Sequence, residues 1–335
     1  MNVFKVIRSS EWWEYKLPPL LALGYATVLQ LNKNIYESAY IIALLICSIM
    51  TGAIYVSLVN DITDMEEDRA SGKRNRMASL SPVLRWTLLL TSLALGAVCA
   101  YFFSGDILSL SLYLAAYLSF TLYSVPPFRL KKRRLWGVLA DACGAHLFPS
   151  LLLVAGTTHF LHLTLNWIWF AATGAWALMY GLRGILWHQF MDRENDMRIG
   201  LRTYATGKSP SAFKIQARII LGIELLALAV MLACIFKATP VIALLAYSIL
   251  LIGYYRKMGI RLILVVPPAN QSWHIVMSSY YQFFLPVALL IEACIIDPKA
   301  WALLVIQLIL FPGIAKSILL DLVMLFRTLR RPIFE

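Results

Sequence analysis

The chain has 335 residues, of which 60% are hydrophobic and only 14% are charged, and its mean hydropathy is +0.71. Water-soluble domains contain about 45–50% apolar and about 25% charged residues, so this composition excludes a soluble globular protein. The net charge is +12. The basic residues fall between long apolar runs, which is typical of membrane topology signals and indicates no nucleic-acid partner.

The predicted elements are apolar α-helices long enough to cross a bilayer, which takes about 20 residues. Before them, the first 20 residues are polar and aromatic, and Trp12, Trp13 and Tyr15 indicate an interfacial segment rather than a cleavable signal peptide. The apolar runs predict helices near 17–31, 37–60, 84–103, 107–124, 136–155, 163–190, 212–236, 239–255, 279–296 and 300–326. Because the first is short and the last is open to another interpretation, we expect nine to ten transmembrane helices in an all-α fold.

Basic residues gather on alternate loops of this predicted bundle. They precede the first helix and follow the even-numbered helices, whereas the opposite loops hold little more than Lys33, Lys237 and Lys299. Positively charged loops stay in the cytoplasm. We therefore expect an integral protein of the plasma (inner) membrane, embedded in the lipid bilayer, with both termini and the even-numbered helix ends in the cytoplasm.

The first of two acidic clusters ends the second predicted helix. If that helix continues, Asn60, Asp64 and Asp68 recur at i, i+4 and i+8 on one face, and Asp61 lies beside it. Stacked carboxylates repel one another unless a cation lies among them. Hard oxygen ligands favour Mg²⁺, which commonly binds one or two carboxylates together with substrate phosphate oxygens.

The second acidic cluster ends the sixth predicted helix and repeats the first after 128 residues (192 − 64). The identical pairs are Asp64 and Asp192, Glu66 and Glu194, Asp68 and Asp196, Gly72 and Gly200, and Arg74 and Arg202. Gln189 falls opposite Asp61, so the second copy lacks its first carboxylate. One such motif alone could be solvated loop charge, but two with the same spacing and flanks favour two facing, inexact copies of one metal–diphosphate half-site.

The same repeat predicts the organisation of the chain. We expect a single transmembrane domain over residues 1–335, with its helices around a central cavity. It would consist of two related four-helix halves, about 17–124 and 136–255, and extra carboxyl-terminal helices at about 279–326.

At these residues the chain resembles the UbiA superfamily of intramembrane prenyltransferases. The family's first motif, N-D-x-x-D-x-x-x-D, is matched in full from Asn60 to Asp68, and its D-x-x-x-D motif is matched by Asp192 and Asp196. Members with a longer second motif have an aspartate where this chain has Gln189. The stretch YSVPPFRLK at 123–131 is similar to the family's Y-S-x-P-P-x-R-L-K segment. The likeness runs from about residue 15 to 297, and members typically have nine helices around a central cavity.

The resemblance implies an enzyme that binds an isoprenyl diphosphate through two Mg²⁺ ions and ionises its allylic C–O bond. An acceptor then captures the carbocation. The implied catalytic metal ligands are Asp61, Asp64, Asp68, Asp192 and Asp196. Cationic side chains suit phosphate oxygens, and the candidate diphosphate-binding residues are Asn60, Lys73, Arg76, Tyr123, Arg129, Lys131, Gln189, Arg202 and Lys208. The basic ones are also topology determinants, and Arg129 and Lys131 are the better candidates because they lie in a matched motif.

Five ionisable residues stand out inside the predicted helices, where charged groups usually face the bundle interior. They are Asp141, His146, Arg183, His188 and Glu224. A phenolic or enolic acceptor would need a base, for which Asp141 and His146 are candidates. Arg183 could reach the diphosphate or pair with an acid such as Asp141. Pairing between helices explains each of the five at least as well.

Several functions remain open from the sequence. We expect prenyl transfer to a small acceptor that is aromatic, a quinone precursor or a lipid. The alternative is a terpene cyclase of the same fold, and transfer of a polyprenyl phosphate to a sugar diphosphate ranks third. A non-enzymatic transporter or lipid-binding protein is disfavoured, because the repeat is parallel rather than inverted and no helix is evidently interrupted at mid-membrane.

Overall fold

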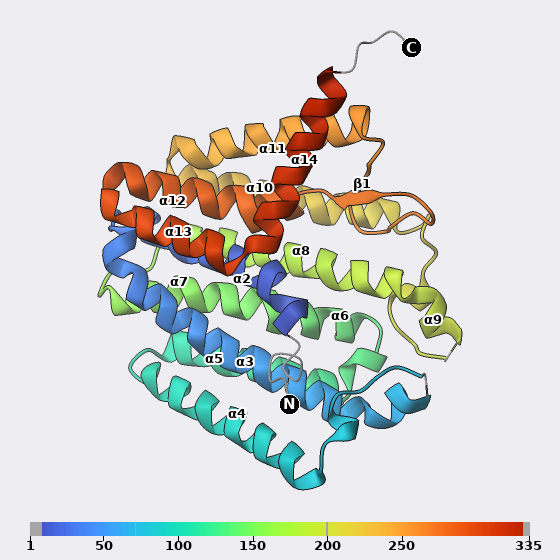
Figure 1. Cartoon of the computed structure of the whole chain (residues 1–335). Coiled ribbons are helices and arrows are strands. Elements are labelled where there is room, and N and C mark those ends of the chain that lie inside the picture. Colours follow the sequence, from blue (N-terminus) through green and yellow to red (C-terminus); the bar gives the residue numbers. More distant parts are fainter. Residues whose placement is uncertain (1–8, 71, 199, 331–335) are drawn as a thin grey trace.

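The structure is a computed structural model that describes residues 9–70, 72–198 and 200–330. Of the first 20 residues, which were expected to include an interfacial segment, residues 1–8 fall outside the described residues. The described chain is mostly helical (Figure 1). Its α-helices are α2 (Ser9–Gln30), α3 (Ile35–Ala70), α4 (Pro82–Phe102), α5 (Ile107–Ser124), α6 (Leu135–Ala142), α7 (Phe148–Phe160), α8 (Trp167–Met191), α9 (Arg193–Arg198), α10 (Lys214–Ile235), α11 (Ala238–Lys257), α12 (Leu285–Ile296), α13 (Trp301–Leu310) and α14 (Pro312–Arg330).

Short elements connect these helices. A π-helix at Cys143–Leu147 joins α6 to α7, and a second one at Tyr280–Phe284 leads into α12. Two three-residue strands, β1 (Arg261–Ile263) and β2 (Trp273–Ile275), pair in parallel between α11 and α12. Single 3₁₀ turns lie in the loops at Met77–Ser79, Leu130–Lys132 and Ala205–Gly207.

Among the described residues, six helical segments are long and apolar enough to cross a membrane. They are Ile35–Ala70, Pro82–Phe102, Ile107–Ser124, Leu135–Phe160, Lys214–Ile235 and Ala238–Lys257. A bent pair, Pro298–Leu310 with Pro312–Thr328, makes a seventh candidate if it is counted as one span. The chain is therefore an integral membrane protein, and length and hydropathy support six or seven of the nine to ten expected spans.

The last expected helix, 300–326, is wrong as a single element. The chain bends by 86° between α13 and α14, at Phe311 and Pro312. Proline lacks an N–H and its ring clashes with the preceding turn, so it ends one helix and begins the next. The carboxylate of Glu14 then caps the new amino terminus, accepting hydrogen bonds from Gly313 N at 3.0 Å and Ile314 N at 2.8 Å.

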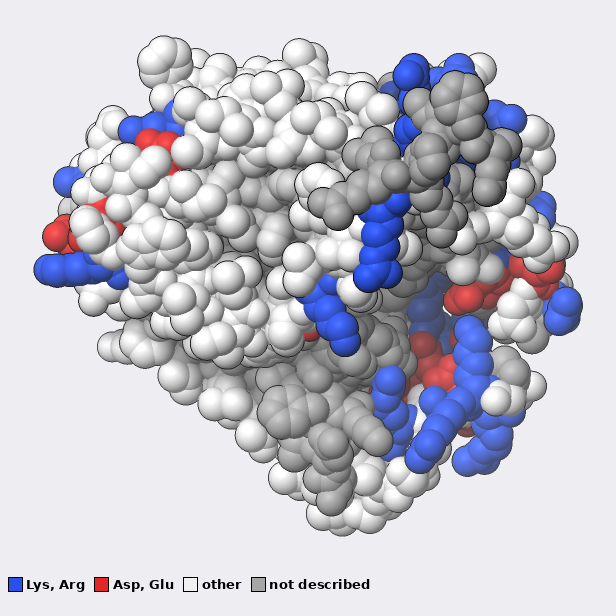
Figure 2. Space-filling model, turned by 45° about the horizontal axis from the view of Figure 1, so that its top comes forward, with Lys and Arg blue, Asp and Glu red and all other residues white. Residues whose placement is uncertain are grey.

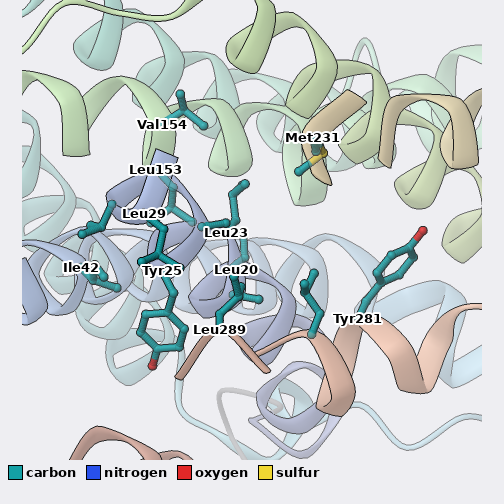
Figure 3. Packing of buried hydrophobic residues seen from close by; sticks show 14 of the residues in the cluster. Leu20, Leu23, Tyr25, Leu29, Ile42, Leu153, Val154, Met231, Tyr281 and Leu289 are labelled. Atoms are coloured by element: carbon teal, nitrogen blue, oxygen red, sulfur yellow. The ribbon is translucent and has the colours of Figure 1, made fainter. Parts of the chain in front are cut away.

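Helix α2 lies at the centre of the bundle rather than at its edge. It packs against α3, α7, α10 and α12. Figure 3 shows this packing through Leu20, Leu23, Tyr25 and Leu29 of α2, Ile42 of α3, Leu153 and Val154 of α7, Met231 of α10 and Leu289 of α12. The carboxyl ends of α3 and α8, which carry the two acidic motifs, lie at the same end of the bundle, at the right of Figure 1.

Candidate active site

The two acidic motifs end in the same backbone turn. Gly72 has a φ of +70° and Gly200 a φ of +69°, a left-handed conformation that glycine adopts without strain. In each turn the glycine N–H donates to the carbonyl three residues earlier at 3.2 Å. The next N–H donates to the carbonyl of Asp68 or Asp196 at 2.8 Å. The repeat seen in the sequence is therefore also a repeat of local backbone structure.

The loops after these turns match as well. Asn75 Nδ2 donates to the carbonyl of Asp61 at 2.8 Å and to Asp68 Oδ2 at 2.7 Å, and its Oδ1 accepts from two backbone N–H groups of the following 3₁₀ turn. Its counterpart 128 residues on is Thr203, whose Oγ1 accepts from Thr206 N at 3.4 Å, again at a 3₁₀ turn. Asn75 thus fixes the first motif to its own loop.

The first motif meets the basic residues that were expected to bind diphosphate. Arg129 Nη2 lies 3.2 Å from Asp64 Oδ1, and Lys131 Nζ contacts the same oxygen. Arg76 Nη1 lies 4.0 Å from Asp61, whose side chain is fully buried. Burial lowers the pKa of Lys131 although the Asp64 carboxylate acts to raise it. Three of the candidate diphosphate-binding residues, Arg76, Arg129 and Lys131, therefore lie against aspartates of the first motif.

The loop that follows the first motif reaches the second motif. Lys73 Nζ, from the loop after α3, lies 3.9 Å from Asp192 Oδ2 at the end of α8. Asp192 is well exposed, whereas Asp196 is buried. Burial, followed by the negative charge of Asp192, raises the pKa of Asp196, and Lys73 acts to lower it. The two motifs therefore share one electrostatic site although they are 128 residues apart.

Three of the candidate diphosphate-binding residues lie away from the contact between Lys73 and Asp192. Gln189 Oε1 accepts hydrogen bonds from the N–H groups of Tyr204 at 3.1 Å and Ala205 at 3.4 Å, so its amide holds the second loop. Arg202 and Lys208 are exposed. In the described part of the chain, no ion pair joins either of them to a motif aspartate.

Acidic side chains are recessed between basic ones at the motif end of the molecule. Figure 2 shows this arrangement at the right of the view. Besides the contacts above, Glu67 Oε1 lies 2.9 Å from Arg129 Nη2 and contacts Lys132 Nζ. The motif end therefore offers both carboxylate oxygens and cationic groups at one surface, which suits a ligand that is an anion accompanied by metal cations.

A cavity of about 850 Å³ extends from the motif end into the bundle. Asn60 and Tyr123 line it at the motif end, and Asn60 Oδ1 accepts a hydrogen bond from Ser124 Oγ at 2.9 Å. Tyr123 lies close enough to Asp64, Asp196 and Asp141 for each carboxylate to act on its hydroxyl electrostatically. Further polar and aromatic lining comes from Tyr113, Tyr117, Phe120, Asp141, His146, Tyr180, Arg183, Trp187, His188, Trp273, His274 and Gln282. Its volume lies within the usual range for small-molecule sites.

Arg183 pairs with an acid between two helices, which was one of the roles expected of it, but that acid is Glu224 rather than Asp141. Its guanidinium pairs with Glu224 on α10 through two contacts, Nε to Oε2 at 2.5 Å and Nη2 to Oε1 at 2.7 Å, and both side chains are buried. Each charge was visible in the sequence as an expensive intramembrane residue. Their pairing, like the role of Asn75, depends on tertiary contacts that the sequence does not display.

The donor set fits a hard cation that is shared with a ligand. Within the described residues, no three His, Cys, Asp or Glu side chains are close enough to hold a metal ion by themselves. Mg²⁺ does not require such a cage, since it commonly binds one or two carboxylates and completes its shell with phosphate oxygens and water. Asp64, Asp68, Asp192 and Asp196 supply carboxylates of this kind at the motif end of the bundle.

Comparison with known proteins identifies relatives in sequence. A family model described as the UbiA prenyltransferase family matches residues 17–262. The chloroplastic 2-acylphloroglucinol 4-prenyltransferase of Humulus lupulus is 32% identical over 132 residues, which cover 36% of this chain and 32% of that protein. A further 2-acylphloroglucinol 4-prenyltransferase of Humulus lupulus is 27% identical over 209 residues, covering 58% of this chain and 50% of that protein. The matched segments thus span half or less of the length of these relatives.

Solved structures share the fold at low sequence identity. A UbiA homologue from Archaeoglobus fulgidus bound to GPP and Mg²⁺ has a TM-score of 0.54 and 14% identity, over 91% of this chain and 99% of that chain. A structure of a UbiA homologue from the same organism bound to Cd²⁺ has a TM-score of 0.55 and 15% identity, with the same coverage. The helical arrangement is therefore common to these proteins.

Proposed function

Since this chain belongs to the UbiA prenyltransferase family, we propose that it is a Mg²⁺-dependent enzyme which transfers the prenyl group of an isoprenyl diphosphate to a small acceptor. The acceptor is aromatic, a quinone precursor or a lipid. One observation carries the proposal: Lys73 bridges to Asp192 at 3.9 Å, so both aspartate motifs face one site. The binding of GPP and Mg²⁺ by the homologue from Archaeoglobus fulgidus supports the same ligands here.

The proposed roles follow from charge and position. Asp61, Asp64, Asp68, Asp192 and Asp196 would hold two Mg²⁺ ions together with diphosphate oxygens. Bound Mg²⁺ would supply charge stabilisation to the departing diphosphate. Among the candidates for the diphosphate, Arg129 and Lys131 already lie against Asp64, and from there they bind and orient its oxygens.

The cavity suits the prenyl chain. Its aromatic lining excludes water, which would quench an allylic cation, and the ring faces of Tyr117 and Tyr123 stabilise positive charge near the motif end. Asn60 lines the polar end of the cavity, next to this aromatic lining. The chain would therefore hold the diphosphate at the mouth and the hydrocarbon within the bundle.

The location of the site follows the charge pattern of the loops. The motif loops carry Lys73, Arg76, Arg202 and Lys208, and loops of this kind stay in the cytoplasm. We place the site on the cytoplasmic side of the plasma membrane. The matching turns at Gly72 and Gly200 support descent of the two halves of the bundle from one four-helix unit.

A terpene cyclase of the same fold is the second candidate. It is favoured by the aromatic cavity wall, since Tyr113, Tyr117 and Phe120 line one side of it. The names of the Humulus lupulus relatives, both 2-acylphloroglucinol prenyltransferases, favour transfer to an aromatic acceptor instead.

Product analysis tests the proposal. The purified protein is incubated with Mg²⁺ and geranyl, farnesyl or geranylgeranyl diphosphate, with and without phenolic, quinone-precursor and lipid acceptors, and the organic products are identified by mass spectrometry. An acceptor whose mass rises by one prenyl group supports transfer. A cyclic hydrocarbon that forms without acceptor assigns the cyclase instead, and intact diphosphate in every combination would contradict both functions.

A further inference from the structure

A polar cluster lies in the cavity beyond the residues that face the diphosphate. Asp141 on α6, His146 in the π-helix and His188 on α8 all line the cavity wall, and none belongs to an aspartate motif. We infer that these three residues form the acceptor subsite, that the acceptor carries a phenolic or enolic hydroxyl, and that Asp141 receives its proton. This inference rests on the proposed function and goes beyond it by naming the residues and the chemistry of the acceptor.

The backbone around His146 is specialised. The continuous helix from Leu135 to Phe160 widens to a π-helix at Cys143–Leu147, and π-bulges inside α-helices occur frequently at functional sites. The His146 ring meets Tyr180 of α8 edge-on, with ring centroids 5.2 Å apart. The π-helix therefore carries an imidazole that packs against α8.

Helix α8 leaves room for this imidazole through two glycines. A Cβ added at Gly181 would lie 2.9 Å from His146 Cβ, a distance that real Cβ atoms essentially never show. A Cβ at Gly184 would lie 4.0 Å from His146 Nε2. His188 follows one turn later on the same helix. The two glycines therefore leave the space between α8 and the π-helix that the His146 side chain fills.

Asp141 occupies the position between the diphosphate end and this imidazole. Tyr123 lies within electrostatic range of the motif residues Asp64 and Asp196 and also of Asp141. Asp141 also lies within electrostatic range of Lys16 of α2, which offsets its negative charge, and of His188. A group placed against Asp141 therefore lies next to the reacting end of a prenyl diphosphate that is held by the motifs.

The side chains of Asp141 and His146 are free to bind a ligand. In the described part of the chain, neither makes a hydrogen bond or an ion pair within 4 Å, although both face the cavity. Polar groups withdrawn from bulk water are normally hydrogen-bonded. A hydroxylated ring supplies donors to the carboxylate and both donors and acceptors to the imidazoles, whereas a plain hydrocarbon supplies neither.

With these groups, every bond and the proton of the transfer step are accounted for. The bond between C1 of the prenyl chain and the diphosphate oxygen breaks, and its electron pair leaves with the diphosphate. A bond forms between C1 and a carbon of the activated ring, and the proton lost by the acceptor passes to the Asp141 carboxylate. His146 and His188 orient the ring through its oxygen substituents. No oxidant or further reactant is consumed.

A binding experiment tests the subsite without requiring turnover. The protein is loaded with Mg²⁺ and geranyl thiolodiphosphate, which resists ionisation, and is titrated with 2,4,6-trihydroxyacetophenone or with 2,4,6-trimethoxyacetophenone. We expect the hydroxylated ring to bind about tenfold more tightly than its methyl ether, because only the former can donate hydrogen bonds. Asp141→Asn and His146→Gln should remove most of this difference, and Asp141→Glu should restore part of it.

The control is Glu292→Gln, a carboxylate-to-amide change in α12 whose side chain pairs with Lys237 and Thr239 away from the cavity. This variant should bind the hydroxylated ring more tightly than its methyl ether by the same factor as the wild type does. Thiolodiphosphate binding in every variant reports that the fold and the diphosphate site are intact. Equal binding of the two rings, binding of neither, or an unchanged preference in Asp141→Asn would overturn the acceptor subsite. A wild type that does not bind thiolodiphosphate in a Mg²⁺-dependent way would instead overturn the proposed function.

Discussion

The buried ion pair between Arg183 and Glu224 offers the sharpest test of the packing. Arg183 is 2% exposed and Glu224 is 0% exposed. The carboxylate also accepts from Tyr281 Oη at 2.8 Å, and Arg183 Nη1 donates to the carbonyls of Leu264 at 3.2 Å and Val276 at 3.0 Å. One guanidinium therefore ties α8 to α10 and to the segment that contains β1 and β2.

The expected magnitudes follow from these contacts. Glu224→Leu leaves a buried guanidinium without its counter-charge, which costs about 4 kcal/mol of stability, and Arg183→Met leaves a buried carboxylate at a similar cost of about 4 kcal/mol. Replacing both partners by apolar side chains is often close to neutral for the pair itself. The double variant still loses the three hydrogen bonds to Tyr281 and the two carbonyls, at about 1 kcal/mol each. We therefore expect a loss of about 3 kcal/mol for Arg183→Met with Glu224→Leu, far below the sum of the single changes.

Equilibrium unfolding in mixed micelles by increasing SDS measures these differences as a double-mutant cycle. The matched control is Glu292→Gln, whose partner Lys237 lies 3.5 Å away and is one-third exposed, so its loss should be below about 1 kcal/mol. Losses below about 1 kcal/mol for the single variants of Arg183 and Glu224, or a double variant equal to their sum, would refute the coupling inferred from the structure.

Three further predictions concern the loops. Lys73→Met should change stability by less than about 0.5 kcal/mol, because Lys73 and Asp192 are exposed, but should raise the KM for an isoprenyl diphosphate about tenfold in steady-state assays. Asn75→Ala should lower stability by about 2–4 kcal/mol in thermal unfolding and Thr203→Ala by only about 1 kcal/mol, because Asn75 makes more hydrogen bonds. Burial lowers the pKa of His274 from 6.5 to about 4, so the unfolded chain takes up a proton first. Stability should therefore fall as the pH drops from 6.5 to about 4, and His274→Gln should flatten that slope in pH-dependent melts.

The helical segments were predictable because hydropathy and helical period are local properties. The helix predicted at 163–190 is observed at Trp167–Met191, and the one predicted at 107–124 is observed at Ile107–Ser124. The bend between α13 and α14 was missed, although Pro312 in the apolar run was its visible signal. The match between the two motifs extends to the backbone because their glycines occupy equivalent turns.

The remaining features depend on contacts between distant parts of the chain. Arg183 and Glu224 are 41 residues apart, and nothing in their local sequence selects one as the partner of the other. The hydrogen bonds that Gln189 accepts from the loop after the second motif could not be predicted either. Its partners Tyr204 and Ala205 come close to it only after the chain turns back. The π-helix at His146 follows from the packing of α6 on α8, and hydropathy does not record it.

Release of inorganic diphosphate tests the metal–diphosphate site most directly. With Mg²⁺ and geranylgeranyl diphosphate, the wild type and Glu292→Gln should release diphosphate, and EDTA should stop the release. Asp64→Ala and Asp192→Ala should each lower the rate at least about 100-fold, since each removes a carboxylate from a site that stabilises the leaving group by several kcal/mol. Release that continues unchanged in EDTA and in both aspartate variants would contradict a shared site formed by the two motifs.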